Sequence, residues 1–171
     1  MTPLSSFDQL LDAVAASIRA AGILPGGARV EPIEGPIDTW IDGNTARYGA
    51  AAPALVAVSR IENAAAGVHE LTLQLGVYFI PEPARIGDQA RALVRQVQNC
   101  LFLIEGNRWG LSGLKKPVRI RAVNRASARL AKDGTALWLI DWEQTVRIRL
   151  AEGALAGRGM PWTVTDGVDA P

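Results

Sequence analysis

The chain has 171 residues, of which 49% are hydrophobic and 20% are charged, and its formal net charge at pH 7 is +1. This length suits one domain with a sizeable core, and the composition is that of a globular protein, which excludes a disordered chain. A charge so close to zero argues against a dedicated nucleic-acid-binding protein, because such proteins usually carry a strong basic excess. The longest apolar runs are far shorter than a membrane-spanning helix, so we expect no membrane association.

Thiol and imidazole groups are scarce, since the sequence has one cysteine, Cys100, and one histidine, His69. A single cysteine excludes an intrachain disulfide, and one residue of each type is too few for a structural zinc site. The amino terminus lacks a basic segment followed by an apolar core, so we expect no secretory signal and synthesis in a reducing cytoplasm.

An amphipathic helix is predicted near the amino terminus. Ser5 and Ser6 are followed three residues later by Asp8 and Gln9, which is a capping-box pattern, and Gly22 is suited to end the helix. The apolar stripe of this helix consists of Phe7, Leu10, Leu11, Val14, Ala15 and Ile18.

Residues 23–52 are rich in glycine and proline and predict a long irregular loop. At most, this loop contains a short strand at Val30–Ile33 or Ile37–Ile41. Loops of this length inside a compact domain are unusual and often functional.

Two strands and a second helix follow the loop. Pro53–Glu62 is a largely apolar strand, and Val68–Ile80 alternates between apolar and polar residues, as a strand with one buried face does. A helix then begins near Gly87-Asp88 and ends before Gly106. Its predicted apolar stripe consists of Ala90, Leu93, Val94, Val97, Leu101 and Ile104.

A long hairpin, Pro117–Leu150, is predicted near the end of the chain. In its second arm the apolar face carries Trp138, Ile140, Trp142, Val146, Ile148 and Leu150, and the wet face carries Asp141, Glu143, Thr145, Arg147 and Arg149. A three-residue turn, Lys132-Asp133-Gly134, keeps the apolar faces of the two arms matched, whereas a two-residue turn does not. The three-residue turn pairs Ala131 with Thr135 and places Arg125 across from Asp141 and Ile120 across from Val146.

The order of elements predicts an α+β fold with a roughly four-stranded, mainly antiparallel sheet and two α-helices packed on one face. We expect a single domain over residues 1–150, including the long irregular loop 23–52. Residues 151–171 are rich in glycine and alanine and are expected to form a flexible C-terminal tail.

A search for catalytic and metal-binding patterns finds none, so no catalytic residue, metal or cofactor is predicted. There is no phosphate-binding loop and no dinucleotide-binding motif, and Gly110-Leu111-Ser112-Gly113 lacks the spacing of a nucleophile elbow. His69 is expected on the wet strand face beside Glu70 as a surface group. Cys100 is expected to be a small core residue rather than a nucleophile.

Arginines and tryptophans are the remaining candidates for function. The arginine face has three interpretations: a solvated charge ladder with Asp141 and Glu143, a protein–protein surface, or a site for the nucleic-acid backbone. Trp138 and Trp142 suit the core, whereas loop or tail tryptophans can be interface anchors or can fold back onto their own domain. The arginines are Arg119, Arg121, Arg125, Arg129, Arg147 and Arg149, and the loop or tail tryptophans are Trp40, Trp109 and Trp162.

Several stretches occur in a characteristic order: Phe7–Ala21, Pro-Ala-Leu-Val-Ala-Val at 53–58, His69–Ile80, Asp88-Gln89-Ala90 with Leu93-Val94, Trp109-Gly110, the arginine-rich strand 118–129, and Leu137–Arg149. In this layout, residues 5–150 resemble the tail-terminator and tail-completion proteins of tailed phages, particularly the Mu-like family. The same layout occurs in neighbouring neck and completion proteins.

The resemblance implies a structural virion protein without enzymatic activity, present in the tail or neck of the virion and in the host cytoplasm during assembly. Such a protein forms a homo-oligomeric ring, a hexamer, that caps the tail tube, ends polymerisation of the tube and any sheath, and joins the tail to the neck or head connector. DNA passes through its lumen without being bound. The six arginines are then expected to face a partner or the lumen, and Trp40, Arg47 and Tyr48 to contact the adjacent subunit.

Two alternatives belong to other functional classes. One is a small cytoplasmic ligand-binding or enzymatic α+β domain with a pocket near His69 and Trp109. The other is a nucleic-acid-binding accessory protein, whose DNA affinity would depend steeply on salt.

Overall fold

A computed structural model describes residues 4–24, 26–33, 40, 49–64, 67–80, 86–125 and 137–149, with only the backbone for 86–90. The elements are α1 (Phe7–Ala20), β1 (Arg29–Val30), β2 (Ala50–Asn63), β3 (Val68–Ile80), α3 (Ile86–Ile104), β4 (Val118–Asn124) and β5 (Trp138–Arg149). The predicted tail 151–171 and the hairpin turn 132–134 lie outside the described residues.

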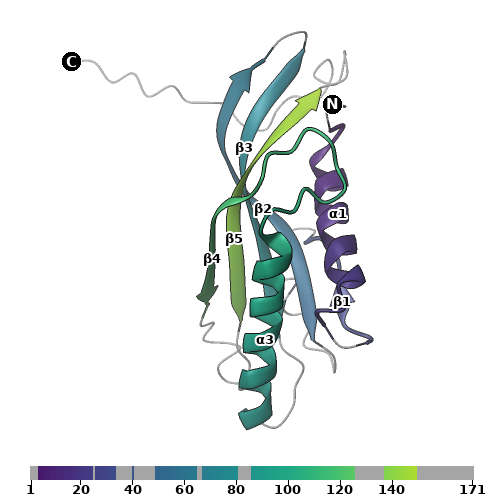
Figure 1. The fold of residues 1–171 in the computed structure, drawn as a ribbon, viewed down its shortest axis with the longest axis vertical. Coiled ribbons are helices and arrows are strands. Elements are labelled where there is room, and N and C mark those ends of the chain that lie inside the picture. Colours follow the sequence, from purple (N-terminus) through teal and green to yellow (C-terminus); the bar gives the residue numbers. More distant parts are fainter. Residues whose placement is uncertain are drawn as a thin grey trace, which may run out of the picture.

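The strands form one sheet in the order β1-β2-β3-β5-β4. Neighbouring strands are antiparallel except for β1, which runs parallel to β2. Both helices lie on one face of the sheet, with α1 beside β1 and β2 and α3 beside β4 and β5 (Figure 1). The predicted α+β fold is therefore confirmed, with one short strand more than expected.

Helix α1 begins at the predicted capping box. The Ser6 side chain accepts a hydrogen bond from the Gln9 backbone N–H at 3.2 Å, and Gln9 Oε1 in turn accepts one from the Ser5 N–H at 3.3 Å. Gly22 follows the helix with a φ of +60°, a conformation that other residues rarely adopt. The buried side chains of α1 are Leu10, Leu11, Val14, Ala15 and Ile18, as its apolar stripe predicts.

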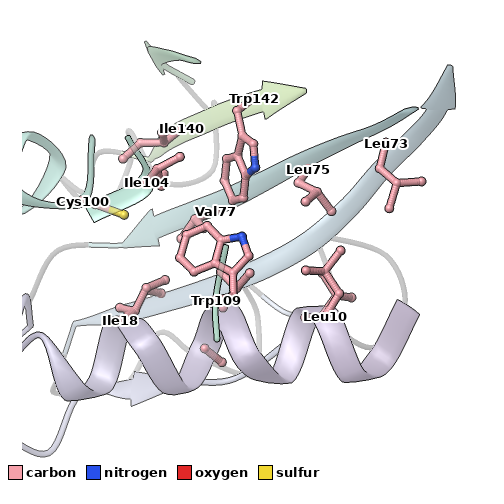
Figure 2. Close-up of a cluster of buried hydrophobic side chains, with 14 of the residues drawn as sticks. Leu10, Ile18, Leu73, Leu75, Val77, Cys100, Ile104, Trp109, Ile140 and Trp142 are labelled. Atoms are coloured by element: carbon pink, nitrogen blue, oxygen red, sulfur yellow. The ribbon is translucent and has the colours of Figure 1, made fainter. Parts of the chain in front are cut away.

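The main core lies between the helices and the sheet (Figure 2). Central strand β3 contributes every second residue from Leu71 to Phe79, and each of these side chains is at most 6% exposed. Helix α3 contributes Leu93, Val97, Cys100 and Ile104, which follow a helical spacing of three and four residues. Val94 was predicted in this stripe, but it is 54% exposed because it lies one residue, or about 100°, away from Leu93 around the helix.

The register of the β4–β5 hairpin differs from the predicted one. Asp141 lies opposite Arg121, four residues from the expected partner Arg125, whose backbone N–H instead donates to the Leu137 carbonyl at 2.6 Å. A shift by an even number of residues leaves every side chain on its own face, so matching of apolar faces cannot distinguish these registers. The observed register brings opposite charges together at Arg121 and Asp141.

The opposite face of the sheet, expected to be wet, is partly covered at one end. Trp40 is 7% exposed and packs in a second cluster with Ala50, Ala52, Ile80 and Leu137. Asp141 is also buried on this face, at 3% exposure, instead of being solvated as predicted. Of the two positions that the sequence allowed for a short strand, Val30–Ile33 corresponds to β1 and the residues after it, since the N–H groups of Glu31 and Ile33 continue the hydrogen bonds to β2. The other position, Ile37–Ile41, lies outside the described residues except for residue 40.

Candidate interaction surfaces

The outer face of the sheet, which is the face away from the helices, carries a ladder of ion pairs. Arg121 Nε lies 2.6 Å from Asp141 Oδ1, and Arg119 Nη1 lies 2.8 Å from Glu143 Oε1. Both pairs join β4 to β5. The hairpin arginines of β4 are therefore partnered within the chain, as the charge-ladder interpretation expects.

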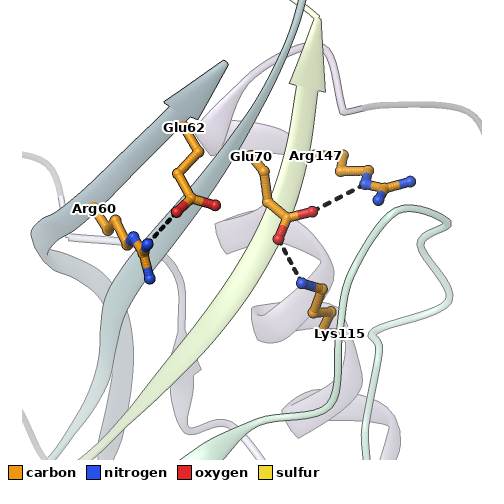
Figure 3. A network of polar contacts seen from close by, with 5 residues as sticks. All are labelled: Arg60, Glu62, Glu70, Lys115 and Arg147. Atoms are coloured by element: carbon orange, nitrogen blue, oxygen red, sulfur yellow. Dashed lines mark hydrogen bonds and ion pairs between the residues drawn. The ribbon is translucent and has the colours of Figure 1, made fainter. Parts of the chain in front are cut away.

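The ladder continues at Glu70 of β3, which lies opposite Arg147 of β5. Glu70 Oε2 accepts a hydrogen bond from Arg147 Nε at 3.1 Å, and Oε1 accepts one from Lys115 (Figure 3). These hydrogen bonds, that from Lys115 first, hold the pKa of the Glu70 carboxyl below its ordinary value. The group is therefore a carboxylate at neutral pH and neutralises part of the surrounding positive charge.

The predicted arginines thus differ in their surroundings. Arg119, Arg121 and Arg147 have carboxylate partners, whereas Arg125 and Arg149 are exposed and have no ion pair among the described residues. Arg129 lies outside the described residues, as do the predicted subunit-contact residues Arg47 and Tyr48.

Two of the loop tryptophans, for which interface contact and fold-back packing were both open, pack against their own chain. Trp40 belongs to the second cluster, where its side chain is 7% exposed. Trp109 is 5% exposed and lies against Trp142, with ring centroids 5.8 Å apart. Fold-back packing therefore accounts for both residues, and Trp162 lies outside the described residues.

A buried polar group, which the sequence pattern did not reveal, anchors Trp109. Gln144 of β5 is 1% exposed on the helix-side face, where its Oε1 accepts hydrogen bonds from Trp109 Nε1 at 2.9 Å and Trp142 Nε1 at 3.2 Å. Its Nε2 donates to the backbone carbonyls of Asn107 at 3.2 Å and Lys115 at 2.9 Å. This side chain therefore ties the loop between α3 and β4 to the centre of the sheet.

The residues with possible catalytic chemistry do not form a site. The register of β3 places His69 on the helix-side face with Leu71, and not on the wet face predicted for it, and the side chain is half-buried. Cys100 is fully buried, and burial raises its thiol pKa to about 12, which suits the predicted core role. No three His, Cys, Asp or Glu side chains in the described part of the chain could hold a metal ion together.

Two surface hollows occur in the described residues, but neither corresponds to the predicted pocket. One, of about 340 Å³, is lined by charged side chains that include Glu70, Arg108, Lys116 and Arg147. The other, of about 360 Å³, lies at the end of α1 and the start of β1. His69 and Trp109 line neither of them.

Large apolar side chains are exposed on three elements. Helix α3 exposes Val94 at 54% and Phe102 at 65%, and β4 exposes Val118 at 55%. Strand β2 exposes Val56 at 43%, Val58 at 40% and Ile61 at 65%. Groups of exposed apolar side chains mark candidate protein-contact surfaces. Neither described helix is long and apolar enough to cross a membrane.

Comparisons with known proteins find similarity among solved structures and not among protein families or curated proteins. No family model matches the chain, and no curated protein matches it. Among solved structures, it is similar to the PVC sheath/tube terminator in the extended state, from a cryo-EM structure of an extracellular contractile injection system. The two are 14% identical with a TM-score of 0.40, and the match covers 100% of this chain and 67% of the other. A TM-score at this level does not support an argument about function.

Proposed function

We propose that this chain is a structural protein that forms a homo-oligomeric ring, a hexamer, at the end of the tail tube of a phage or phage-derived particle. The ring stops polymerisation of the tube, and of the sheath in a contractile tail, and joins the tail to the neck or head connector. The order α1, β2, β3, α3, β4 and β5 supports this proposal, because the resemblance to tail terminators depends on that order.

The exposed apolar surface of α3 is the observation that carries the proposal. Val94 and Phe102 lie about two helical turns apart, and the side chains of both are exposed. Exposed apolar side chains grouped on one element mark a candidate contact surface. A closed ring needs two different complementary faces on each subunit. We assign the α3 surface to one of these faces and the loop carrying Arg47 and Tyr48 to the other.

The outer face of the sheet suits a surface that DNA passes without being held. Tight binding to a DNA backbone needs cationic groups that release counterions from phosphates. Arg119, Arg121 and Arg147 already have carboxylate partners, so little of their charge is available for this purpose. The paired arginines therefore favour a lumen wall or a protein contact over a DNA-binding site.

The oligomeric state of the full chain tests this proposal. Light scattering after size-exclusion chromatography and electron microscopy should be done on the chain alone and mixed with a tail tube protein from the same genome. We expect a closed species of six 18.2 kDa chains, or caps at tube ends.

A pair of variants tests the assigned face. The double change Val94→Lys and Phe102→Lys should abolish the ring, whereas Ala16→Lys, on the exposed side of α1, should retain it. A strict monomer at every concentration, both alone and with tube protein, contradicts the proposed function. A ring that tolerates both lysines on α3 contradicts the assignment of this face.

A further inference from the structure

Among the described residues, the outer edge of β2 has no partner over most of its length. Strand β1 pairs only with Ala50 and Ala51, and the last hydrogen bond on this side runs from the Ile33 N–H to the Pro53 carbonyl. From residue 54 to 63, no described residue pairs with this edge. A row of unpaired backbone groups is a template for another strand.

The chain covers the outer edge of β5 much more completely. Strand β4 pairs with the first half of β5, and the Lys115 N–H donates to the Thr145 carbonyl at 2.9 Å. Leu4 then exchanges backbone hydrogen bonds with Arg147 and Arg149. On that side β4 is the terminal strand, and no described strand pairs with its outer edge either, so the β2 edge is distinguished by the side chains along it.

The last part of this edge is both regular and self-complementary. Two irregularities interrupt the pairing of β2 with β3 before Arg60, but the register is continuous from Arg60 to Asn63. Ile61 is 65% exposed in the middle of this stretch. Arg60 and Glu62 flank it on the outer face, where they form an exposed ion pair with each other (Figure 3).

We propose that residues 60–62 of β2 pair antiparallel with the same residues of a second copy of this chain, with Ile61 opposite the partner's Ile61. In this register Arg60 lies opposite the partner's Glu62, and Glu62 lies opposite the partner's Arg60. Each of the four charges then has two neighbours of opposite sign. The two exposed isoleucines cover each other on the helix-side face.

Other registers lose this complementarity. Pairing centred on Arg60 or on Glu62 places two like charges directly opposite each other, and parallel pairing in register does the same for both residues. Antiparallel pairing centred on Ile61 is therefore the arrangement that the charges favour.

The contact is two-fold and closes after two copies, because the charge pattern of Arg60, Ile61 and Glu62 occurs once along the unpaired edges of the described strands. The irregularities before Arg60 limit its length and hinder the addition of further strands. An interface this short is of the weak class, so we expect a dissociation constant of about 10–1,000 µM. This pairing does not depend on the proposed ring, which needs a contact between two different faces.

Charge exchange at two exposed positions tests the register. Sedimentation equilibrium should be measured to millimolar concentration for the wild type, Arg60→Glu, Glu62→Arg and the double variant. Each single change places like charges together and should raise the dissociation constant at least about tenfold. The double variant should restore dimerisation, and so should an equimolar mixture of the two single variants, because their charges are complementary.

Disulfide trapping tests the position of the two-fold axis. Ile61→Cys should form a disulfide-linked dimer under mild oxidation, and adding Arg60→Glu should slow this reaction. Val118→Cys is the matched control on β4, with a similar exposure, and the native Cys100 is buried and should not react. A monomer at all concentrations, a dimer unaffected by both single charge reversals, or equal trapping at residues 61 and 118 would overturn the proposal. A ring lost with the α3 lysines while this dimer persists contradicts neither proposal.

Discussion

Replacing Gln144 with leucine should destabilise this protein more than any other change of similar size on β5. The side chain makes four hydrogen bonds while it is 1% exposed. Leucine has nearly the same volume, so the change removes these hydrogen bonds without creating a large cavity. It leaves two indole N–H groups and two backbone carbonyls without partners.

The expected loss follows from the cost of unpaired buried groups. Each buried donor or acceptor without a partner costs about 1–3 kcal/mol, and the separate costs do not add in full because the loop can relax and admit water. We therefore expect Gln144→Leu to lower the free energy of unfolding by about 3–5 kcal/mol. This is a large part of the total stability of an ordinary domain.

Urea unfolding followed by far-ultraviolet circular dichroism measures this loss, and tryptophan fluorescence reports the surroundings of Trp109 and Trp142. Gln74→Leu is the matched control, because Gln74 is half-buried on the outer face of β3 and no side-chain hydrogen bond is recorded for it among the described residues. We expect the control to change the stability by less than about 1 kcal/mol.

A double-mutant cycle with Trp109→Phe separates the indole hydrogen bond from the rest of the effect. Phenylalanine removes the donor to Gln144 Oε1, so the two changes should cost less together than the sum of their separate costs. A loss below about 1 kcal/mol for Gln144→Leu, or strict additivity in the cycle, would refute the assigned role of this glutamine.

Three further changes test other parts of the structure. Arg121→Ala leaves the buried carboxylate of Asp141 alone and should cost about 1–3 kcal/mol in urea unfolding, whereas Arg119→Ala, whose carboxylate partner is more exposed, should cost less than about 0.5 kcal/mol. The pKa of Glu70 is lower in the folded chain than its unfolded value of 4.5, so the ionised carboxylate stabilises the fold above pH 4.5, and this stability is lost as the pH falls through the folded pKa. Wild-type protein should therefore lose more stability on acidification below pH 4.5 than Glu70→Gln does. A thiol reagent at pH 8 should label Cys100 only on unfolding, because the thiol is buried and its pKa is about 12; rapid labelling of the native chain would contradict this placement.

Alternation and helical periodicity were sufficient to predict most elements of this fold. The capping box at Ser6, the buried stripe of α1 and the alternation along β3 each depend on residues close in sequence, and each is found in the structure. The hairpin register was wrong because it depends on the length of the connection between β4 and β5. Matching the apolar faces of the two strands cannot distinguish registers that differ by an even number of residues.

The buried glutamine shows a second limit of pattern analysis. Gln144 interrupts the apolar side of β5 between Trp142 and Val146. The alternation of a strand cannot show whether such a residue is solvated or is buried with all its hydrogen bonds made inside the protein. A polar residue between two large apolar ones on a buried face was the available signal. Three of its four partners come from the segment between α3 and β4, 29 to 37 positions away in sequence, so only the assembled fold reveals them.

The ion pairs on the outer face of the sheet bear on which function the arginine-rich hairpin has. A DNA-binding surface gains affinity from each cation that replaces a counterion, so a pairing carboxylate reduces that gain. Asp141 and Glu143 lie on the same strand face as the arginines, and each accepts one of them. Residues of β5 thus neutralise the basic residues of β4. A face built in this way resists both strong DNA binding and promiscuous association, because any partner must first replace an existing ion pair. The exposed apolar side chains of α3 and β2 carry no such cost, and for this reason we place the contacts between copies of the chain there.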